Sequence, residues 1–482
     1  MKIIDKKTIA DILSEKIKTL NKEEIKELLE VPPSEIDFTY AFPCFRLAKT
    51  EKKSPDLIAK DLENEIKNTD VLDDVKAVGS YLNLKVKSKY ILEPIFKLQE
   101  DYGRIRETMN EVEKKKKRIV IEYPSPNTNK PLHFGHIRNI LLGKSLSNLL
   151  DYKGNKVFQV NLYNNRGIHI CKSMLAYKKW GVSQDPNKKP DHFVGDFYVM
   201  YSKMAEKDPT LEQEAYDLLR LWENGDKDTI DLWKKMNNWA LEGFDVTFKK
   251  LDISFDKVYY ESDLYLKGKE IILDGLRKGI FQKTEDGAIY AKFDEKYKLP
   301  DKFLIRSDGT TIYITQDIYL AYKKQSDFNY DRSIHVVGDP QIQHFKWLFA
   351  LLEMLGFKGD NYHLAYGMIE LPSGKMKSRE GTVVDGDDVL EEVENLALIE
   401  VNKRYPNIDE SEKVRRANSI GLAAIKFFIL KYNANKGFIF KPDESISFEG
   451  ETGPYILYCY ARIESILSKS DIKVSTNINW DL

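Results

Sequence analysis

Apolar residues in the middle of the chain form short strand-like runs separated by segments with helical spacing. The run RIVIEY at 118–123 is rich in β-formers and stops at Pro124, and NKVFQVNLY at 155–163 is a second such run. Between them, apolar residues recur at helical spacing, namely Ile137, Ile140, Leu141, Leu146, Leu149 and Leu150. A strand, a helix and a second strand in this order predict a βαβ unit of a parallel sheet.

Further strand-like runs follow only after a long interval. They lie at residues 288–293, 311–315, 333–338 and 362–371, with an apolar helical pattern at 343–356. The interval itself, about residues 172–275, is largely helical in pattern. We therefore expect an α/β domain whose sheet is split by a helical insertion.

The two flanking regions have different patterns. Residues 1–112 combine helical periodicity with an alternating run at 76–86, which predicts a small α+β domain. Residues 388–482 are typical of helices throughout. The chain is therefore expected to divide into domains at 1–112, 113–387 and 388–482.

One helix of the last region has an apolar stripe. Pro454 suits the first turn of a helix that ends near Lys469. One side of it carries Tyr455, Tyr458, Arg462, Ile463 and Ile466. Such a stripe is more typical of the core of a helical bundle than of a ligand site.

Composition places the chain among globular proteins. It has 482 residues, 42% hydrophobic and 31% charged, with 75 basic and 76 acidic residues. No stretch approaches the ~20 apolar residues of a membrane span, and the N-terminus lacks the apolar core of a secretory signal. Cys44, Cys171 and Cys459 share no CxxC spacing, which argues against disulfides and a zinc ribbon. A cytoplasmic protein is expected, and a nucleic-acid partner would need a local basic face.

The segment PNTNKPLHFGHIRN, residues 126–139, joins the first strand to its helix. At this kind of junction the free N–H groups and the dipole of the helix favour anions. His133 and His136 can donate hydrogen bonds to phosphate oxygens, and Gly135 allows a base or ribose to approach the backbone. Two alternatives stay open, an ordinary polar surface and half of a zinc site, although no Cys or carboxylate at a familiar spacing completes the latter.

A basic segment, LPSGKMKSREGTVV, follows the last strand-like run at residues 371–384. It carries Lys375, Lys377 and Arg379 between two glycines. A loop of this kind at the end of a late strand is suited to closing over a triphosphate. Taken alone, it would be interpreted as an exposed basic turn.

Together, HFGH and KMKSR resemble the HIGH and KMSKS signatures of class I aminoacyl-tRNA synthetases. Within that class, the chain resembles the arginyl-tRNA synthetases along nearly its whole length. YPSPNTNKPLHFGHIRN is similar to the extended first signature of that family. Other similar blocks occur in family order, namely DHFVGDFYV, LWKKMNNWALEGFD, IRSDGTTIYITQDI, VVGDPQIQHF and TGPYILYCYARI. The resemblance implies a Rossmann-type catalytic domain with a helical insertion, an N-terminal α+β domain and a partial C-terminal α-helical bundle.

The resemblance also implies an activity. It is that of an arginine–tRNA ligase, which activates L-arginine with ATP and Mg²⁺ and transfers it to the terminal adenosine of tRNA(Arg). Because negative charge builds on phosphoryl oxygens, catalysis is expected to depend on positioning and charge stabilisation. The implied catalytic residues are His133, His136, Lys375 and Lys130, and the implied ATP-binding residues are Gly135, Met376, Lys377, Ser378 and His344.

One departure concerns the second signature. The general class I pattern has a second lysine where this chain has Ser378. Arginyl enzymes often lack it, and a lysine upstream of the first signature, here Lys130, is thought to substitute. The division of charge between Lys130 and Lys377 stays open.

Substrate choice follows from the chemistry of arginine. A guanidinium is planar, always charged and carries five donors, so its pocket needs carboxylates and carbonyl-type acceptors. By resemblance, the arginine-binding residues are Ser125, Asn127, Glu261, Tyr313, Asp317 and Gln341. Tyr313 and Asp317 are four residues apart, so one helical turn can present both. Which acid binds the guanidinium stays open.

The flanking regions imply partners. The N-terminal domain resembles a module that contacts the outer corner of tRNA, and the C-terminal helices resemble an anticodon-binding bundle. Since the family continues well beyond the point where this chain ends, an incomplete bundle is expected. We expect a monomer that binds tRNA(Arg), arginine and ATP, with no membrane and no resident metal. The alternatives are a class I synthetase for another amino acid and a non-catalytic tRNA-binding relative.

Overall fold

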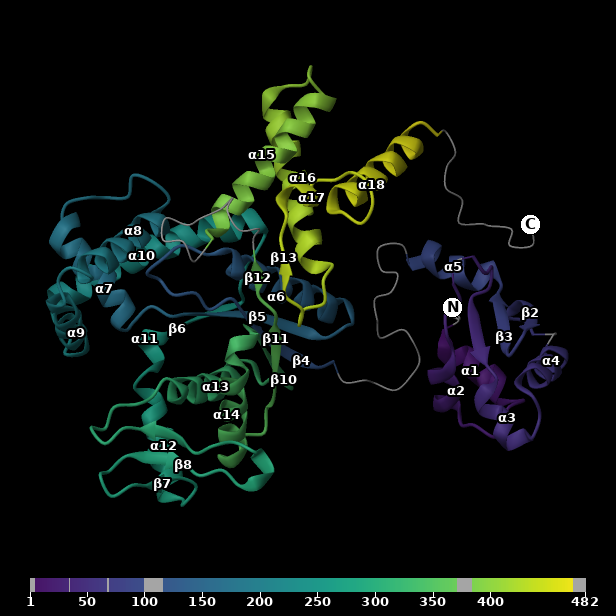
Figure 1. Ribbon diagram of the computed structural model, residues 1–482, viewed down its shortest axis with the longest axis horizontal. Helices are drawn as coiled ribbons and strands as arrows, with labels where there is room; N and C mark the ends of the chain where they lie inside the picture. Colours follow the sequence, from purple (N-terminus) through teal and green to yellow (C-terminus); the bar gives the residue numbers. More distant parts are fainter. Residues whose placement is uncertain (1–4, 34, 67–68, 99–115, 371–383, 471–482) are drawn as a thin grey trace. The chain divides into compact units, whose positions relative to one another are not determined.

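The computed structural model describes residues 5–33, 35–66, 69–98, 116–370 and 384–470 (Figure 1). The chain divides into two compact units, and each is described by itself. One comprises residues 1–104 with 470–482, and the other comprises residues 105–469.

The smaller unit is an α+β domain, as expected. Its three strands form an antiparallel sheet in the order β1-β3-β2. They are β1 (Tyr40–Pro43), β2 (Leu72–Val78) and β3 (Tyr81–Val86). The helices are α1 (Lys6–Ser14), α2 (Lys22–Leu28), α3 (Phe45–Glu51), α4 (Pro55–Ile66) and α5 (Ser88–Leu98). Apolar residues of α1, α2 and α4 form one core with Leu82 and Leu84 of β3.

The larger unit is built on a five-stranded parallel sheet in the order β11-β10-β4-β5-β6. The strands are β4 (Arg118–Glu122), β5 (Lys156–Tyr163), β6 (Lys257–Tyr260), β10 (Arg332–Gly338) and β11 (Asp360–Tyr366). The predicted βαβ unit is confirmed as β4, α6 (Phe134–Tyr152) and β5. Strand order reverses between β4 and β10, and open α/β sheets bind ligands at the carboxyl ends of strands beside such a switch point.

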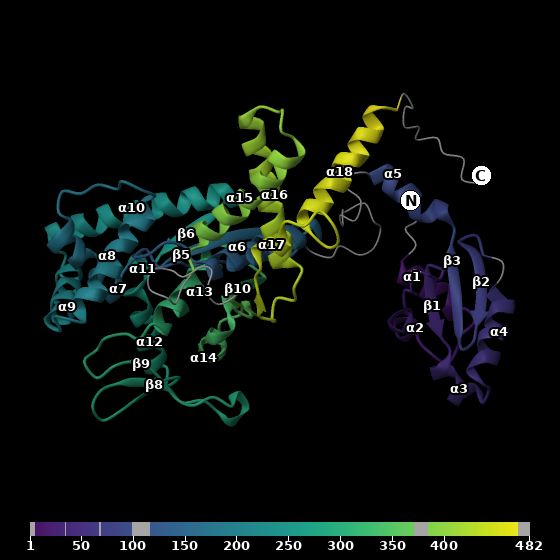
Figure 2. The same cartoon turned by 45° about the horizontal axis from the view of Figure 1, so that its top comes forward.

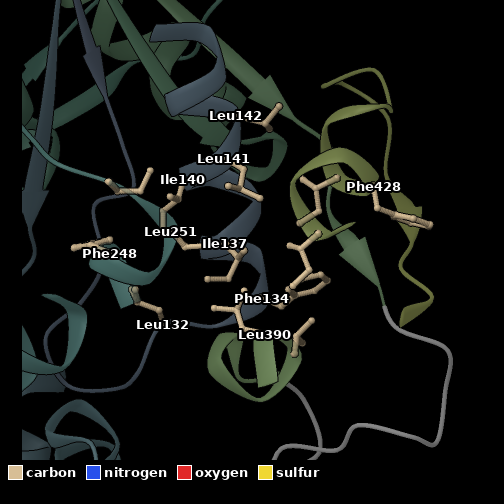
Figure 3. Close-up of a cluster of buried hydrophobic side chains, with 14 of the residues drawn as sticks. Leu132, Phe134, Ile137, Ile140, Leu141, Leu142, Phe248, Leu251, Leu390 and Phe428 are labelled. Atoms are coloured by element: carbon tan, nitrogen blue, oxygen red, sulfur yellow. The ribbon is translucent and has the colours of Figure 1, made fainter. Parts of the chain in front are cut away.

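Alternate residues of β4 face opposite sides of the sheet, as strand geometry requires. Ile119 and Ile121 join a core cluster with α6, whereas Val120 joins a second cluster with α13 (Ile314–Phe328). Figure 3 shows Ile137, Ile140 and Leu141 of α6 in the first cluster, with side chains from other helices around them. This packing fixes α6 against one face of the sheet, and with it the histidine segment beyond the carboxyl end of β4.

The predicted helical insertion lies between β5 and β6. Its helices are α7 (Ile168–Ala176), the π-helix η2 (Tyr177–Gly181), α8 (Pro190–Ala205), α9 (Thr210–Glu223) and α10 (Lys227–Leu251). The helical section ends earlier than the pattern indicates, because β6 already pairs with β5 inside the interval 172–275. Its four residues, KVYY, are too few to show an alternation.

Two strand predictions need correction. Residues 288–293 contribute β8 to a small antiparallel sheet and not to the parallel one. Residues 311–315 are not a strand, because α13 begins at Ile314. The β-branched side chain of Ile314 lies on the buried face of this helix. The elements here are α11 (Glu261–Leu264), α12 (Lys267–Arg277), β7 (Gln282–Lys283), β8 (Ile289–Ala291), η3 (Glu295–Tyr297), β9 (Lys302–Ile305), η4 (Asp339–Gln341) and α14 (Ile342–Met354).

The C-terminal part of this unit is mainly helical. Its helices are α15 (Gly386–Arg404), α16 (Glu410–Leu430), α17 (Pro442–Ser445) and α18 (Gly453–Ser468), and α15 and α16 lie side by side (Figure 2). The region is not helical throughout, because β12 (Ile369–Glu370) pairs with β13 (Phe438–Ile439). Leu390 of α15 and Phe428 of α16 share the core of α6 (Figure 3).

The expected core stripe of α18 is instead exposed in the described residues. Ile463 and Ile466 are 56% and 64% exposed, and Tyr455 and Tyr458 are exposed as well. The residues of α18 that are buried are Gly453 and Pro454, in its first turn. A Cβ on Gly453 would lie 2.1 Å from the carbonyl oxygen of Ala423, so this turn approaches α16 closely. Periodicity identified the helix but not the extent of its contact with α16.

Among the described residues, no helix is both long enough and apolar enough to cross a membrane.

Candidate active site

The N-terminus of α6 holds the two histidines in a reciprocal arrangement. His133 is the N-cap, and its Nδ1 accepts the backbone N–H of His136 at 3.3 Å. The Nδ1 of His136 accepts the backbone N–H of His133 at 3.1 Å. The two rings stack with their centroids 3.6 Å apart. This is a capping box made of imidazoles, which pairs two backbone N–H groups and orients both rings.

The same hydrogen bonds determine how the rings are protonated. Because each Nδ1 accepts an N–H, the proton of each neutral imidazole lies on Nε2, which is a donor. Burial, followed by the charge of Lys130, lowers the pKa of His133 to about 4. Burial, His133 and Lys130 lower the pKa of His136 well below its usual value. At neutral pH the pair therefore offers two uncharged N–H donors.

Gly135 lies between the two histidines. A Cβ at this position would lie 3.0 Å from both Cε1 and Nδ1 of His133, so a side chain would displace that ring. The lack of a side chain at Gly135 therefore leaves space for the His133 ring, in addition to its expected role of allowing a nucleotide to approach the backbone. Lys130 is half-buried in the preceding loop, near enough for its charge to lower the pKa of both histidines.

The segment that follows the basic loop is attached to the histidine segment. Phe134 donates its N–H to the carbonyl oxygen of Val384 at 2.9 Å, and Gly386 donates to that of Leu132 at 2.8 Å. Asp385 forms an isolated antiparallel bridge with His133. The basic-loop residues Lys375, Met376, Lys377 and Ser378 lie outside the described residues.

Ser125 and Asn127 lie in the loop that follows β4, and asparagines at the end of β5 hold this loop. Ser125 has a φ of 56°. Its N–H donates to Oδ1 of Asn161 at 3.1 Å, and its carbonyl oxygen accepts from Nδ2 of Asn164 at 2.9 Å. Asn127 forms an isolated parallel bridge with Asn164. These asparagines were not expected from the sequence, although the segment NLYNN, with three asparagines at the end of an apolar run, was an available signal.

Glu261 begins α11 directly after β6, and its side chain is buried. Nε2 of Gln316 donates to its Oε1 at 3.1 Å. Burial raises the pKa of Glu261 to about 7, although Gln316 and the charge of Arg166 act in the opposite direction. Asn165 holds the same turn, because its Oδ1 accepts the N–H of Ser262 at 3.0 Å and its Nδ2 lies 3.1 Å from the hydroxyl of Ser262.

Tyr313 and Asp317 lie at the start of α13, as their spacing predicted. Nε2 of His344 lies 2.8 Å from Oδ2 of Asp317, and the rings of Tyr313 and His344 are 5.8 Å apart. Burial raises the pKa of Asp317, against the lowering effect of His344. His344, implied as an ATP-binding residue, therefore contacts an arginine-binding candidate. Gln341 is exposed in η4, just beyond the end of β10.

A buried ion pair lies at the end of β4 and was not expected from the sequence. Nζ of Lys324 donates to Oε2 of Glu122 at 2.7 Å and to the hydroxyl of Ser333 at 3.3 Å. Nδ1 of His335 lies 3.6 Å from Oε1 of Glu122. Burial alone would raise the pKa of Glu122, but Lys324 and His335 lower it below its usual range. The available signal was Lys324 itself, seven residues after Asp317 and so on the same face of α13.

The arrangement has two sides with different chemistry. Imidazole donors and Lys130 surround the N-terminus of α6, whereas Glu261 and Asp317 lie beyond β6 and at the start of α13. The site is therefore suited to a molecule or pair of molecules that carries a polyphosphate at one end and a cation at the other.

Family comparisons match both units. The sequence model described as "tRNA synthetases class I (R), catalytic domain" matches residues 104–441. The one described as "Arginyl tRNA synthetase N terminal domain" matches residues 6–86.

Proteins with similar sequences are named arginine–tRNA ligases. The chain is 45% identical over 460 residues to the arginine–tRNA ligase of Treponema denticola, covering 92% of this chain and 76% of that protein. It is 43% identical over 495 residues to that of Borrelia turicatae, covering 99% and 82%.

Solved structures have a similar fold. The arginyl-tRNA synthetase of Thermus thermophilus matches with a TM-score of 0.77 at 24% identity, covering 98% of this chain and 83% of that one. That of Plasmodium falciparum matches with a TM-score of 0.74 at 20% identity, covering 98% and 82%. These likenesses confirm the predicted Rossmann-type fold class.

Proposed function

The chain belongs to the arginyl-tRNA synthetase family, and from this premise we propose how its own residues perform the reaction. As an arginine–tRNA ligase, it activates arginine with ATP and then transfers arginine to the terminal adenosine of tRNA. The observation that carries the proposal is the division of charge at the carboxyl edge of the sheet. Neutral donors with Lys130 suit the phosphates of ATP, and the carboxyls of Glu261 and Asp317 suit arginine.

In the first step, a carboxylate oxygen of arginine attacks the α-phosphorus, and the bond to the leaving pyrophosphate breaks. Negative charge then increases on the phosphoryl oxygens, where fixed donors are most effective. His133 and His136 donate from Nε2 to these oxygens, Lys130 adds positive charge, and Gly135 keeps the His133 ring in place.

We assign Lys375 to the pyrophosphate side, with Met376, Lys377 and Ser378 beside it, on the sequence resemblance alone. ATP enters as its magnesium complex, so the ion is part of the substrate.

The arginine substrate carries two positive groups, its guanidinium and its α-amino group. We assign them to the carboxylates of Asp317 and Glu261, with neutral polar contacts from Ser125, Asn127, Tyr313 and Gln341. We keep His344 as an ATP-binding residue on the resemblance, and its Nε2, 2.8 Å from Oδ2 of Asp317, also orients that carboxylate. A carboxylate pair rejects an acidic amino acid by repulsion and an apolar one because its buried acids would stay unpaired.

The remaining regions are assigned to tRNA. We propose residues 1–112 as the domain that contacts the outer corner of tRNA, 113–387 as the catalytic domain and 388–482 as the anticodon-binding region. We further propose that the protein acts as a monomer in the cytoplasm. The free thiols of Cys44, Cys171 and Cys459 support a reducing compartment.

ATP–pyrophosphate exchange with each of the twenty amino acids, with and without tRNA(Arg), tests the proposed function. Exchange supported best by arginine is the expected result. Exchange supported best by lysine or glutamate would overturn the assignment in favour of another class I synthetase. Intact tRNA binding with no exchange for any amino acid, even with tRNA present, would indicate a non-catalytic relative.

A further inference from the structure

A second polar cluster joins the helical insertion to the segment beside the histidines. Lys189, which precedes α8, donates from Nζ to Oδ2 of Asp191 at 2.9 Å, to Oγ1 of Thr247 at 2.7 Å and to Oδ2 of Asp387 at 2.5 Å. Thr247 of α10 donates to Oδ1 of Asp387 at 2.9 Å. Nε2 of His192 lies 2.8 Å from Oδ2 of Asp387. We call Lys189, Asp191, His192, Thr247 and Asp387 the lysine hub.

The hub is complete without a bound ion. Asp191, His192 and Asp387 are close enough together to ligate a metal, but the ammonium of Lys189 is already bonded to both carboxylates. Burial would raise the pKa of Asp387, but His192 and Lys189 lower it to about 2. Asp387 is therefore an anion at neutral pH, held by three donors from the insertion, namely Lys189, His192 and Thr247.

Two glycines allow the close approaches on which the hub depends. A Cβ on Gly243 of α10 would lie 2.3 Å from Oδ1 of the fully buried Asp191. A Cβ on Gly386 would lie 2.8 Å from the carbonyl oxygen of Leu132, which directly precedes His133. The insertion and the start of α15 are thus packed against their neighbours without room for a side chain.

From Asp387, a short series of contacts leads to His133. The N–H of Asp387 donates to Oδ1 of Asp385 at 2.8 Å, and Asp385 forms the isolated bridge with His133. The neighbouring Val384 and Gly386 are hydrogen-bonded to Phe134 and Leu132. The backbone on both sides of His133 is therefore fixed by the segment that ends at Asp387.

We propose that Lys189, Thr247 and Asp387 are positioning residues for the activation of arginine. They fix residues 384–387, and through them the ring of His133, while touching no substrate themselves. The inference rests on the proposed function, because it takes His133 as a donor to ATP. Misplacing a reacting or stabilising group by ~1 Å can slow a reaction by ~100-fold.

The proposal predicts that loss of the hub changes kcat and the KM for ATP but not the KM for arginine. Loss of the hub lowers kcat and alters the KM for ATP, because the displaced group is on the phosphate side. The KM for arginine stays within about twofold, because Glu261 and Asp317 are held by other contacts, with Gln316 and His344. A hub that only holds helices together would give no such division.

Thr247 offers a pair of matched variants. Thr247→Val keeps the shape but removes the hydroxyl that bonds Lys189 and Asp387, whereas Thr247→Ser keeps the hydroxyl. We expect Thr247→Val to lower kcat of ATP–pyrophosphate exchange by roughly tenfold and Thr247→Ser to retain most of it. Equal kcat for the two variants would contradict the proposal.

Lys189→Met removes the centre of the hub, and Lys250→Met is its control. Lys250 also links α10 to α15, through Oε2 of Glu394 at 2.7 Å, but its bond is outside the hub. We expect Lys189→Met to lower kcat by up to ~100-fold with an unchanged KM for arginine, and Lys250→Met to leave both unchanged.

Two results would overturn the proposal. One is an equal loss of kcat in Lys189→Met and Lys250→Met, and the other is a loss accompanied by an equal rise in the KM for arginine. Thermal unfolding of each variant accompanies the kinetics, and the Thr247 pair decides the outcome if Lys189→Met does not fold. Exchange by the unaltered chain with arginine tests the proposed function separately, since the hub is judged by ratios between variants.

Discussion

The two sides of the candidate site respond to burial in opposite ways. At the N-terminus of α6, His133 and His136 are neutral, because burial lowers their pKa and backbone N–H groups bond to their Nδ1 atoms. At the end of β4, Glu122 remains charged, because Lys324 and His335 compensate it. The two histidines are therefore uncharged at neutral pH, whereas Glu122 stays charged and is paired with Lys324 and His335.

The acidic side itself contains two kinds of carboxyl group. The pKa of the paired Glu122 is lowered, whereas burial raises the pKa of Glu261 to about 7 and also raises that of Asp317. A buried acid without sufficient positive charge is favourably placed to receive a cation from a ligand. On this side of the site, the direction of the shift therefore distinguishes Glu122 from the two acids that we assign to arginine.

The largest expected effect concerns the paired acid. Lys324→Met leaves Glu122 buried without its partner and should lower the free energy of unfolding by about 3–5 kcal/mol. Lys323→Met is the control, since Lys323 lies on the same helix but pairs with Asp327 near the surface. Urea denaturation measures both. Equal losses of stability in the two variants would contradict the claim that the buried Glu122 depends on its pairing with Lys324.

The next effect concerns the neutral donors. His136→Ala removes one donor to the phosphoryl oxygens and should lower kcat of ATP–pyrophosphate exchange by about 10²–10³-fold. Binding of tRNA, measured by filter retention, should be mostly unchanged because the ring is assigned to ATP. An equal collapse of tRNA binding would show that the histidine is structural.

A smaller effect is expected in the pH dependence of arginine binding. Glu261 is protonated and neutral below its pKa of about 7, so the KM for arginine should fall as pH rises from 6 to 8. One proton per site limits the slope to roughly tenfold per pH unit. Glu261→Gln should remove this dependence. A dependence of the same size in that variant would assign the titration to another group.

The sequence predicted the parts of the site that local pattern controls. The junction of β4 and α6, with His133 and His136 at the helix start, follows from an apolar run, a proline and helical spacing. Tyr313 and Asp317 were correctly expected on one helical turn, although the residues around Ile314 were predicted as a strand.

Pairings over long distances in the chain could not be predicted. The partners of Lys324 and Asp387 are 202 and 198 residues away, and no periodicity connects them. The exposure of α18 was mispredicted for the same reason, since it depends on which other element covers the helix. Strand β6 was missed because its four residues are too few to show an alternation.

Calorimetric titration of arginine in the absence of ATP tests the division of the site most directly. The unaltered chain, Asp317→Asn and His136→Ala are compared at one pH. We predict that Asp317→Asn weakens arginine binding by roughly 100-fold, because it removes half of a charge pair, while His136→Ala leaves the Kd unchanged. Equal weakening by the two variants, or none by Asp317→Asn, would contradict the assignment of the acidic side to arginine and of the histidine side to ATP.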